Sequence, residues 1–166
     1  MTVRRAARPA AVLLVLVAAL VVAELLSGNG DAKAHPAPPL PTRVLTPPAK
    51  TVAALAGKPA IVHFWASWCG PCTKEAPQLA LLARELHGRA TLVGVDYSDS
   101  RSGAEAFLAK HGWRFPVLVD ANGNAGDAYG INGLPSTFVL DRKGRVVKRL
   151  TGGQTAAGLL AAIRNL

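Results

Sequence analysis

Short apolar runs alternate along this chain with segments that have helical periodicity. Residues 60–65, 91–96 and 115–120 are apolar stretches with the length of a buried strand. Residues 69–87 repeat apolar positions at helical spacing, and Ser102-Gly103-Ala104-Glu105 predicts a capping box that opens a helix to about residue 110. The pattern predicts strands that alternate with helices.

The C-terminal part of the chain has a different pattern. Residues 137–140 and 145–150 flank Asp141-Arg142-Lys143-Gly144, which predicts a β-hairpin. We expect a helical turn at residues 127–130 and a closing helix at residues 155–166. Together with the preceding units, these elements predict an α/β fold in which a mixed central sheet carries helices on both faces.

Residues 1–34 have the pattern of an export signal. Three arginines precede the apolar run of residues 10–26, which only Glu24 interrupts. We expect this run to be kept as a membrane anchor, so that the chain contacts the membrane through an N-terminal helix. Cleavage after the small-x-small sequence Ala32-Lys33-Ala34 is the alternative. In either case we expect the rest of the chain to lie outside the cytoplasm.

Residues 27–48 predict a spacer that leads into the folded domain. Proline is frequent from residue 35 to residue 48, and such segments favour extended polyproline II structure. We therefore place one domain at residues 35–166, with a proline-rich lead-in up to about residue 48.

The chain is basic, with 19 Lys and Arg against 10 Asp and Glu and a formal net charge of +9. Its positive residues are scattered, and the densest groups, at residues 142–145 and 148–149, fall in the predicted hairpin. A nucleic-acid-binding protein would concentrate such charge on one face, so we expect no nucleic-acid partner. Attraction to an anionic membrane surface fits the charge better.

Cys69 and Cys72 are the only two cysteines of the chain. The apolar run of residues 60–65 leads them to a predicted helix start, and Pro71 suits the first turn of that helix. Free N–H groups and the helix dipole would stabilise the Cys69 thiolate. Cys72 lies one turn further on the same face and can close a disulfide with Cys69. We therefore predict that Cys69 attacks and that Cys72 resolves the mixed disulfide.

Three other uses of a cysteine pair fit less well. A structural disulfide more often closes a long loop, whereas this ring restricts the unfolded chain very little. A zinc site needs four ligands, and no second Cys or His pair has the matching spacing, so we expect no metal. Haem attachment needs a His directly after the second cysteine, where Thr73 stands.

The sequence Phe64-Trp65-Ala66-Ser67-Trp68-Cys69-Gly70-Pro71-Cys72 resembles the active site of thioredoxin-fold oxidoreductases. With Gly57-Lys58-Pro59 before it and Glu75-Ala76-Pro77 after it, the chain resembles the extracytoplasmic TlpA/ResA-type (DsbE/CcmG-like) branch from about Pro38 to its end. The resemblance implies a thioredoxin-like fold, an edge strand within residues 41–46, and no cofactor other than the redox-active disulfide.

The resemblance also assigns roles to Pro135 and Glu75. Pro135 matches the family's cis-proline, which leaves the backbone of Leu134 free to pair with an extended substrate; the alternative is an ordinary turn proline. Glu75 matches an acidic residue near the cysteines, whose raised pKa would let it pass a proton during exchange. A solvated glutamate favoured by the helix dipole is the alternative.

His63 departs from the family pattern. It stands six residues before Cys69, where thioredoxins carry a buried acid. The imidazole could carry a proton to the Cys72 side as part of catalysis, or could simply form a hydrogen bond within the core.

Apolar side chains near the cysteines suit docking of an extended polypeptide. We expect Trp65 to lie in the core. The predicted substrate-binding residues are Trp68, Gly70, Pro71, Leu134 and Pro135.

These observations predict an exported, membrane-tethered protein thiol–disulfide oxidoreductase. The Gly70-Pro71 dipeptide is that of reducing thioredoxins, which favours a reductant. The resemblance implies a membrane electron donor of the CcdA/DsbD type and disulfide-containing protein substrates, with apocytochrome c among them. A disulfide-forming oxidase of the same fold, or a redox-inactive binding or chaperone module, are the alternatives.

Overall fold

The computed structural model of the chain describes residues 31–166. The predicted membrane segment at residues 10–26 lies outside the described residues. Within residues 31–166, no helix combines the length and the apolar character that crossing a bilayer requires.

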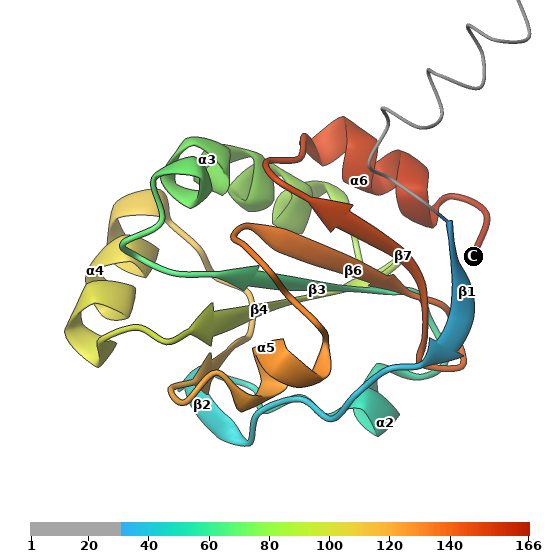
Figure 1. Ribbon diagram of the computed structural model, residues 1–166. Coiled ribbons are helices and arrows are strands. Elements are labelled where there is room, and N and C mark those ends of the chain that lie inside the picture. Colours follow the sequence, from blue (N-terminus) through green and yellow to red (C-terminus); the bar gives the residue numbers. More distant parts are fainter. Residues whose placement is uncertain (1–30) are drawn as a thin grey trace, which may run out of the picture. The chain divides into compact units, whose positions relative to one another are not determined.

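A seven-stranded mixed sheet forms the centre of the described region (Figure 1). Its strands in chain order are β1 (Asp31–Pro36), β2 (Arg43–Thr46), β3 (Ala60–Trp65), β4 (Thr91–Tyr97), β5 (Val117–Asp120), β6 (Ser136–Leu140) and β7 (Arg145–Thr151). They lie side by side in the order β1-β7-β6-β3-β4-β5-β2. Strands β3, β4 and β5 run parallel, and the other neighbouring pairs are antiparallel. The predicted hairpin of β6 and β7 and the predicted edge strand β2 are confirmed.

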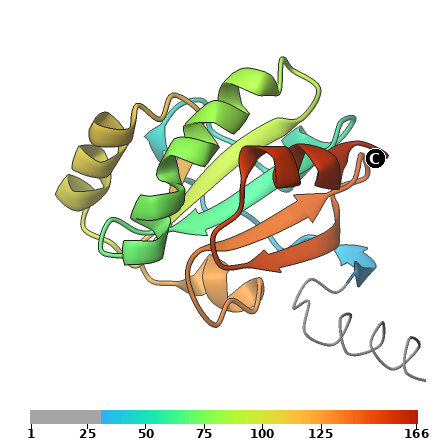
Figure 2. The same cartoon turned by 90° about the horizontal axis from the view of Figure 1, so that it is seen from above.

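Helices cover both faces of the sheet, as predicted. They are α2 (Val52–Leu55), α3 (Gly70–Glu85), α4 (Arg101–His111), α5 (Asn124–Ala128) and α6 (Ala156–Ile163). Figure 2 shows α3 between α4 and α6 on one face, while α2 and α5 lie on the other face in Figure 1. The α/β fold class is therefore confirmed.

Every residue of β3 is buried because both faces of this central strand are covered. Its side chains alternate between two hydrophobic clusters: Ile61 and Trp65 join the cluster below α3, while Val62 and Phe64 join the cluster of the opposite face. A strand at the centre of the sheet therefore needs apolar side chains on both of its faces.

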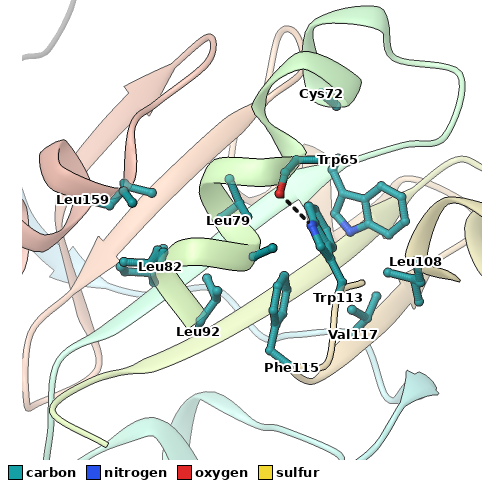
Figure 3. Close-up of a cluster of buried hydrophobic side chains, with 14 of the residues drawn as sticks. Trp65, Cys72, Leu79, Leu82, Leu92, Leu108, Trp113, Phe115, Val117 and Leu159 are labelled. Carbon is teal, nitrogen blue, oxygen red and sulfur yellow. Dashed lines mark hydrogen bonds between the residues drawn. The ribbon is translucent and has the colours of Figure 1, made fainter. Parts of the chain in front are cut away.

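Trp113 anchors α3 to the sheet within the first cluster. Its indole Nε1 donates a hydrogen bond of 3.0 Å to the carbonyl oxygen of Ala76, as Figure 3 shows. The same figure places Cys72 at the beginning of α3, above this cluster, together with Leu79 and Leu82 further along the helix. The core therefore fixes the helix that carries the cysteines.

The N-terminal spacer differs from the expectation. Residues 31–36 form β1, which pairs with β7 through the registers His35↔Val146 and Pro36↔Arg145. Extended polyproline II and β backbones have similar dihedral angles, so composition alone does not distinguish them. Pro36 is tolerated because β1 is an edge strand.

The capping residue of α4 was predicted wrongly. The N-cap is Ser100, whose Oγ accepts a hydrogen bond from Gly103 N at 3.1 Å, and the helix begins at Arg101 rather than after Ser102. Glu105 does not form the capping box because Gly103 stands at the third helical position, and Glu105 instead pairs with Arg101 at 2.9 Å. Ser100 and Ser102 are both residues that favour an N-cap, so local sequence alone did not distinguish them.

Helix α5 begins earlier than the predicted turn at residues 127–130. The carboxylate of Asp120 accepts hydrogen bonds from Ala125 N at 3.1 Å and Gly126 N at 2.8 Å, which stabilises the first turn from Asn124 onward. The short helix α2 was not predicted at all. Thr51 caps it through a hydrogen bond from Ala54 N.

Candidate active site

Several loops meet where β3 ends. The parallel register pairs Trp65 of β3 with Asp96 of β4, and the antiparallel register pairs Phe64 with Ser136 at the start of β6. Ser136 in turn pairs with Thr151 at the end of β7. Four connecting segments therefore lie at the same end of the central strands. Three of them follow β3, β4 and β7, and the fourth precedes β6.

Cys69 and Cys72 form a disulfide at the start of α3. Cys69 is the N-cap residue, and its Sγ accepts a hydrogen bond from Cys72 N at 3.1 Å. The two residues are 4% and 1% exposed, respectively, so Cys69 is the more accessible of the pair. The N–H group of Cys72 at the helix start thus points at Cys69 Sγ, the sulfur that we predicted to attack. This hydrogen bond stabilises the thiolate form of Cys69.

The loop before the cysteines is held from the neighbouring strand. Asp99 accepts hydrogen bonds from both Ser67 N and Ser67 Oγ, the second at 2.9 Å. The indole Nε1 of Trp68 donates to the carbonyl oxygen of Ser98 at 3.1 Å. The loop after β4 therefore sets the position of the cysteine loop.

Glu75 is buried one turn after Cys72. Its side chain is 1% exposed, and its Oε1 accepts a hydrogen bond from Gln154 N at 2.8 Å. Desolvation raises the pKa of Glu75 to about 7, although the hydrogen bond from Gln154 lowers it in part. The alternative of a solvated glutamate is therefore wrong, and the raised pKa suits proton transfer near neutral pH.

His63 is buried in the middle of β3 with polar groups on both sides. Its Nδ1 lies 2.9 Å from Thr137 Oγ1, and its Nε2 lies 3.8 Å from Glu75 Oε2. Complete burial lowers the pKa of His63 to about 3, so the ring is neutral at physiological pH. His63 is thus a hydrogen-bonded core residue that also borders Glu75, and its role in catalysis stays a prediction.

The predicted substrate-binding residues surround the start of α3. Trp68 is 61% exposed, Gly70 and Pro71 are exposed, and Leu134 is half-buried. The Leu134–Pro135 peptide bond is cis, as the resemblance implied. Leu134 packs against the hydrophobic cluster that contains both cysteines. Trp65 lies fully in the core, as expected.

Several neighbours of the site were missed by sequence reasoning. Asp99, Thr137 and Gln154 act through hydrogen bonds between distant segments, and nothing in their local sequence marks them. Asp96, at the end of β4, is a further buried carboxyl group. Desolvation, together with the carboxylates of Asp99 and Asp120, raises the pKa of Asp96 to about 7.

Comparison with known protein families assigns most of the described region to one family. The family model described as Redoxin matches residues 32–163. The thiol-disulfide oxidoreductase ResA of Bacillus subtilis (strain 168) is 35% identical over 102 residues, which cover 61% of this chain and 57% of ResA. The thiol:disulfide interchange protein CycY of Rhizobium leguminosarum bv. viciae is 35% identical over 124 residues, which cover 74% of this chain and 66% of CycY. The chain thus spans somewhat over half the length of these relatives.

A solved structure shows the same fold. The thiol:disulfide interchange protein, a thioredoxin family protein from Chlorobium tepidum TLS, superposes with a TM-score of 0.70 at 27% sequence identity. The match covers 81% of this chain and 97% of that one. The thioredoxin-like fold is therefore confirmed.

Proposed function

The chain belongs to the Redoxin family, and from this we propose that it is an exported protein thiol–disulfide oxidoreductase that reduces disulfides in other proteins. The resemblance to ResA-type proteins, first noted at the cysteine motif, is confirmed by the matches with ResA and CycY. One observation above all carries the proposed activity: Cys69 caps α3, and its sulfur accepts the N–H of Cys72.

In the proposed reaction the reduced pair gives two electrons to a substrate disulfide. The Cys69 thiolate attacks one substrate sulfur, and the other substrate sulfur leaves and takes up a proton. Cys72 then loses its proton to Glu75, one turn along α3, and attacks the Cys69 sulfur. The second substrate sulfur leaves, takes up a proton and is released as a thiol, and the enzyme is left with the Cys69–Cys72 disulfide that the structure contains.

The surface around the cysteines supports a polypeptide substrate. Trp68, directly before Cys69, is an exposed aromatic residue. β6 begins only at Ser136, so the backbone of Leu134 is available to pair with an extended segment, as in β-strand addition.

The cellular setting of the proposed enzyme follows from the family resemblance and from the N-terminal sequence. We place it on the extracytoplasmic side of the cell membrane, held by residues 10–26, or secreted if that segment is removed. A reductant in this location needs a source of electrons, and we propose a membrane donor of the CcdA/DsbD type. Apocytochrome c is the proposed substrate among disulfide-containing proteins.

The function is tested with the full-length chain in an insulin reduction assay supplied with a small thiol donor. We expect insulin to be reduced faster than by the donor alone, and we expect the potential of the Cys69–Cys72 couple, equilibrated with glutathione, to lie near about −270 mV. A rate equal to that of the donor alone would remove the proposed activity. A potential near about −120 mV would instead identify a disulfide-forming oxidase.

Replacing Trp68 by alanine should weaken the recognition of protein substrates. Aromatic hot-spot side chains that become buried in an interface contribute about 2 kcal/mol or more, so we expect kcat/KM for insulin to fall by about 30-fold or more. The rate with a small aromatic disulfide should change by less than about 3-fold. Leu81→Ala is the matched control, because Leu81, on α3, is the other exposed large apolar residue within residues 31–166. Equal losses on insulin and on the small disulfide would place Trp68 in the reaction itself rather than in docking.

A further inference from the structure

Two buried polar side chains, Glu75 on α3 and His63 on β3, lie close together, and the proposed reaction uses only Glu75. The side chains of Glu75 and His63 are each 1% exposed. The ring of Trp113 packs edge-on against His63 at a centroid distance of 6.0 Å. Water therefore does not solvate these groups freely, and the partners of each polar atom decide its protonation state.

The two carboxyl oxygens of Glu75 have different surroundings. Oε1 accepts the N–H of Gln154. Oε2 is buried and has no hydrogen-bond partner among the described residues, and the nearest ring nitrogen is Nε2 of His63 at 3.8 Å. A proton taken up by Glu75 is therefore held most readily at Oε2, on the side that faces the imidazole.

His63 can present either a donor or an acceptor to that oxygen. Its Nδ1 lies 2.9 Å from the hydroxyl of Thr137, and a hydroxyl can donate or accept. When Thr137 donates to Nδ1, the ring proton is on Nε2. When Thr137 accepts from Nδ1, Nε2 presents its lone pair.

We propose that His63 is a positioning residue for Glu75, whose neutral ring changes tautomer with the protonation state of the carboxyl group. The Nε2–H tautomer donates to the ionised carboxylate, and the Nδ1–H tautomer accepts the proton of the carboxylic acid. The imidazole holds one proton in both states, so only the charge of Glu75 changes. The distance of 3.8 Å exceeds a hydrogen bond, and a shift of about 1 Å would complete the contact.

This inference rests on the proposed function, because it explains how a buried carboxyl group could exchange a proton with Cys72. Each protonation state of Glu75 would have a hydrogen-bond partner, which an aliphatic residue at position 63 could not supply. The burial of both side chains agrees with the neutral form of the imidazole.

Few other charged groups face this pair among the described residues. Lys74 lines the same hollow as Glu75, which has a volume of about 320 Å³ and opens beside Pro71. The sulfurs of Cys69 and Cys72 titrate only in the reduced protein. The remaining contacts are made by groups that carry no charge. They are Thr137 on β6, Gln154 before α6 and Trp113 before β5.

Nuclear magnetic resonance of the full-length oxidised chain tests the proposal directly. Nitrogen-15 shifts of the imidazole report which ring nitrogen carries the proton, and carbon-13 shifts report the ionisation of Glu75. We expect His63 to change tautomer at the same pH at which Glu75 titrates, near pH 7.

Two variants should move the Glu75 titration in opposite directions. His63→Leu removes the donor to the carboxylate, and we expect the midpoint to rise by at least about one pH unit. Thr137→Val leaves a buried Nδ1–H without an acceptor, so it favours the Nε2–H tautomer, and we expect the midpoint to fall. Glu75→Gln should leave the His63 tautomer independent of pH.

A His63 tautomer that stays constant while Glu75 titrates would overturn the proposal, as would an unchanged midpoint in both variants. If His63→Leu does not fold, the nearly isosteric Thr137→Val still decides the point. These signals do not depend on turnover. Failure of the insulin assay would therefore remove the proposed function without affecting the tautomer change of His63. A constant His63 tautomer would overturn this inference without affecting the insulin assay.

Discussion

Replacing Cys69 by serine should reduce the rate of insulin reduction by a factor of about 10³ or more, to that of the thiol donor alone. Only a thiolate attacks a disulfide at a useful rate, and a serine hydroxyl does not ionise near neutral pH. The N–H of Cys72 that points at Cys69 Sγ would have no sulfur anion to stabilise. Rates are to be compared at equal concentrations of folded protein.

Replacing Cys72 by serine should stop the same reaction one step later. Cys69 would still attack, but no second thiol would release the product, so a covalent adduct with the substrate should accumulate. The chain has no other cysteine, so any adduct must form at Cys69, and mass spectrometry after trapping should detect it. An adduct on Cys69→Ser, whose one remaining thiol is Cys72, would reverse the assigned order of attack.

The cysteine motif was predictable because the relevant information is local. An apolar run, a helix start and a spacing of three residues place Cys69 and Cys72 together without any knowledge of the tertiary structure. The same holds for β3, whose predicted limits at Ala60 and Trp65 agree with the structure. A strand covered on both faces is mostly apolar, and β3 shows this pattern in the sequence with His63 as its one polar residue.

Features that depend on distant partners could not be predicted. Ser100 rather than Ser102 caps α4, and Asp99, directly before this cap, accepts hydrogen bonds from Ser67, 32 residues away. Residues 31–36 join the sheet because the edge of β7 is available, and their own composition gives no sign of this. The pairing of His63 with Thr137 links residues 74 positions apart.

Glu75 makes the stability of the folded chain depend on pH. Its pKa is about 7 in the folded chain against an ordinary value of 4.5, so folding favours the protonated form. The stabilisation that this form contributes is complete below about pH 4.5 and is lost as the pH rises through about 7. The difference in pKa corresponds to about 3 kcal/mol of unfolding free energy.

Glu75→Gln should remove this dependence, because an amide does not titrate and its oxygen can still accept the N–H of Gln154. We expect the difference in unfolding free energy between the two proteins to change by about 3 kcal/mol between about pH 4.5 and about pH 8, in favour of the variant at high pH. Urea unfolding of the oxidised chains measures it.

Comparing the two proteins also separates Glu75 from the other buried titratable groups. The raised pKa of Asp96 causes a loss of stability in the same direction, whereas the lowered pKa of His63 causes a loss as the pH falls from about 6.5 toward about 3. Both contributions are present in the wild type and in Glu75→Gln, and they cancel in the difference because folded His63 is neutral throughout the pH range compared and Asp96 is perturbed by Asp99 and Asp120 rather than by Glu75. Glu105→Gln, at an exposed carboxyl group on α4, is the matched control and should change the unfolding free energy by no more than about 0.5 kcal/mol. Parallel curves of unfolding free energy against pH for wild type and Glu75→Gln would mean that Glu75 binds its proton equally well in the folded and unfolded chains. Glu75 would then be no better suited than an exposed glutamate to take the proton of Cys72 near neutral pH.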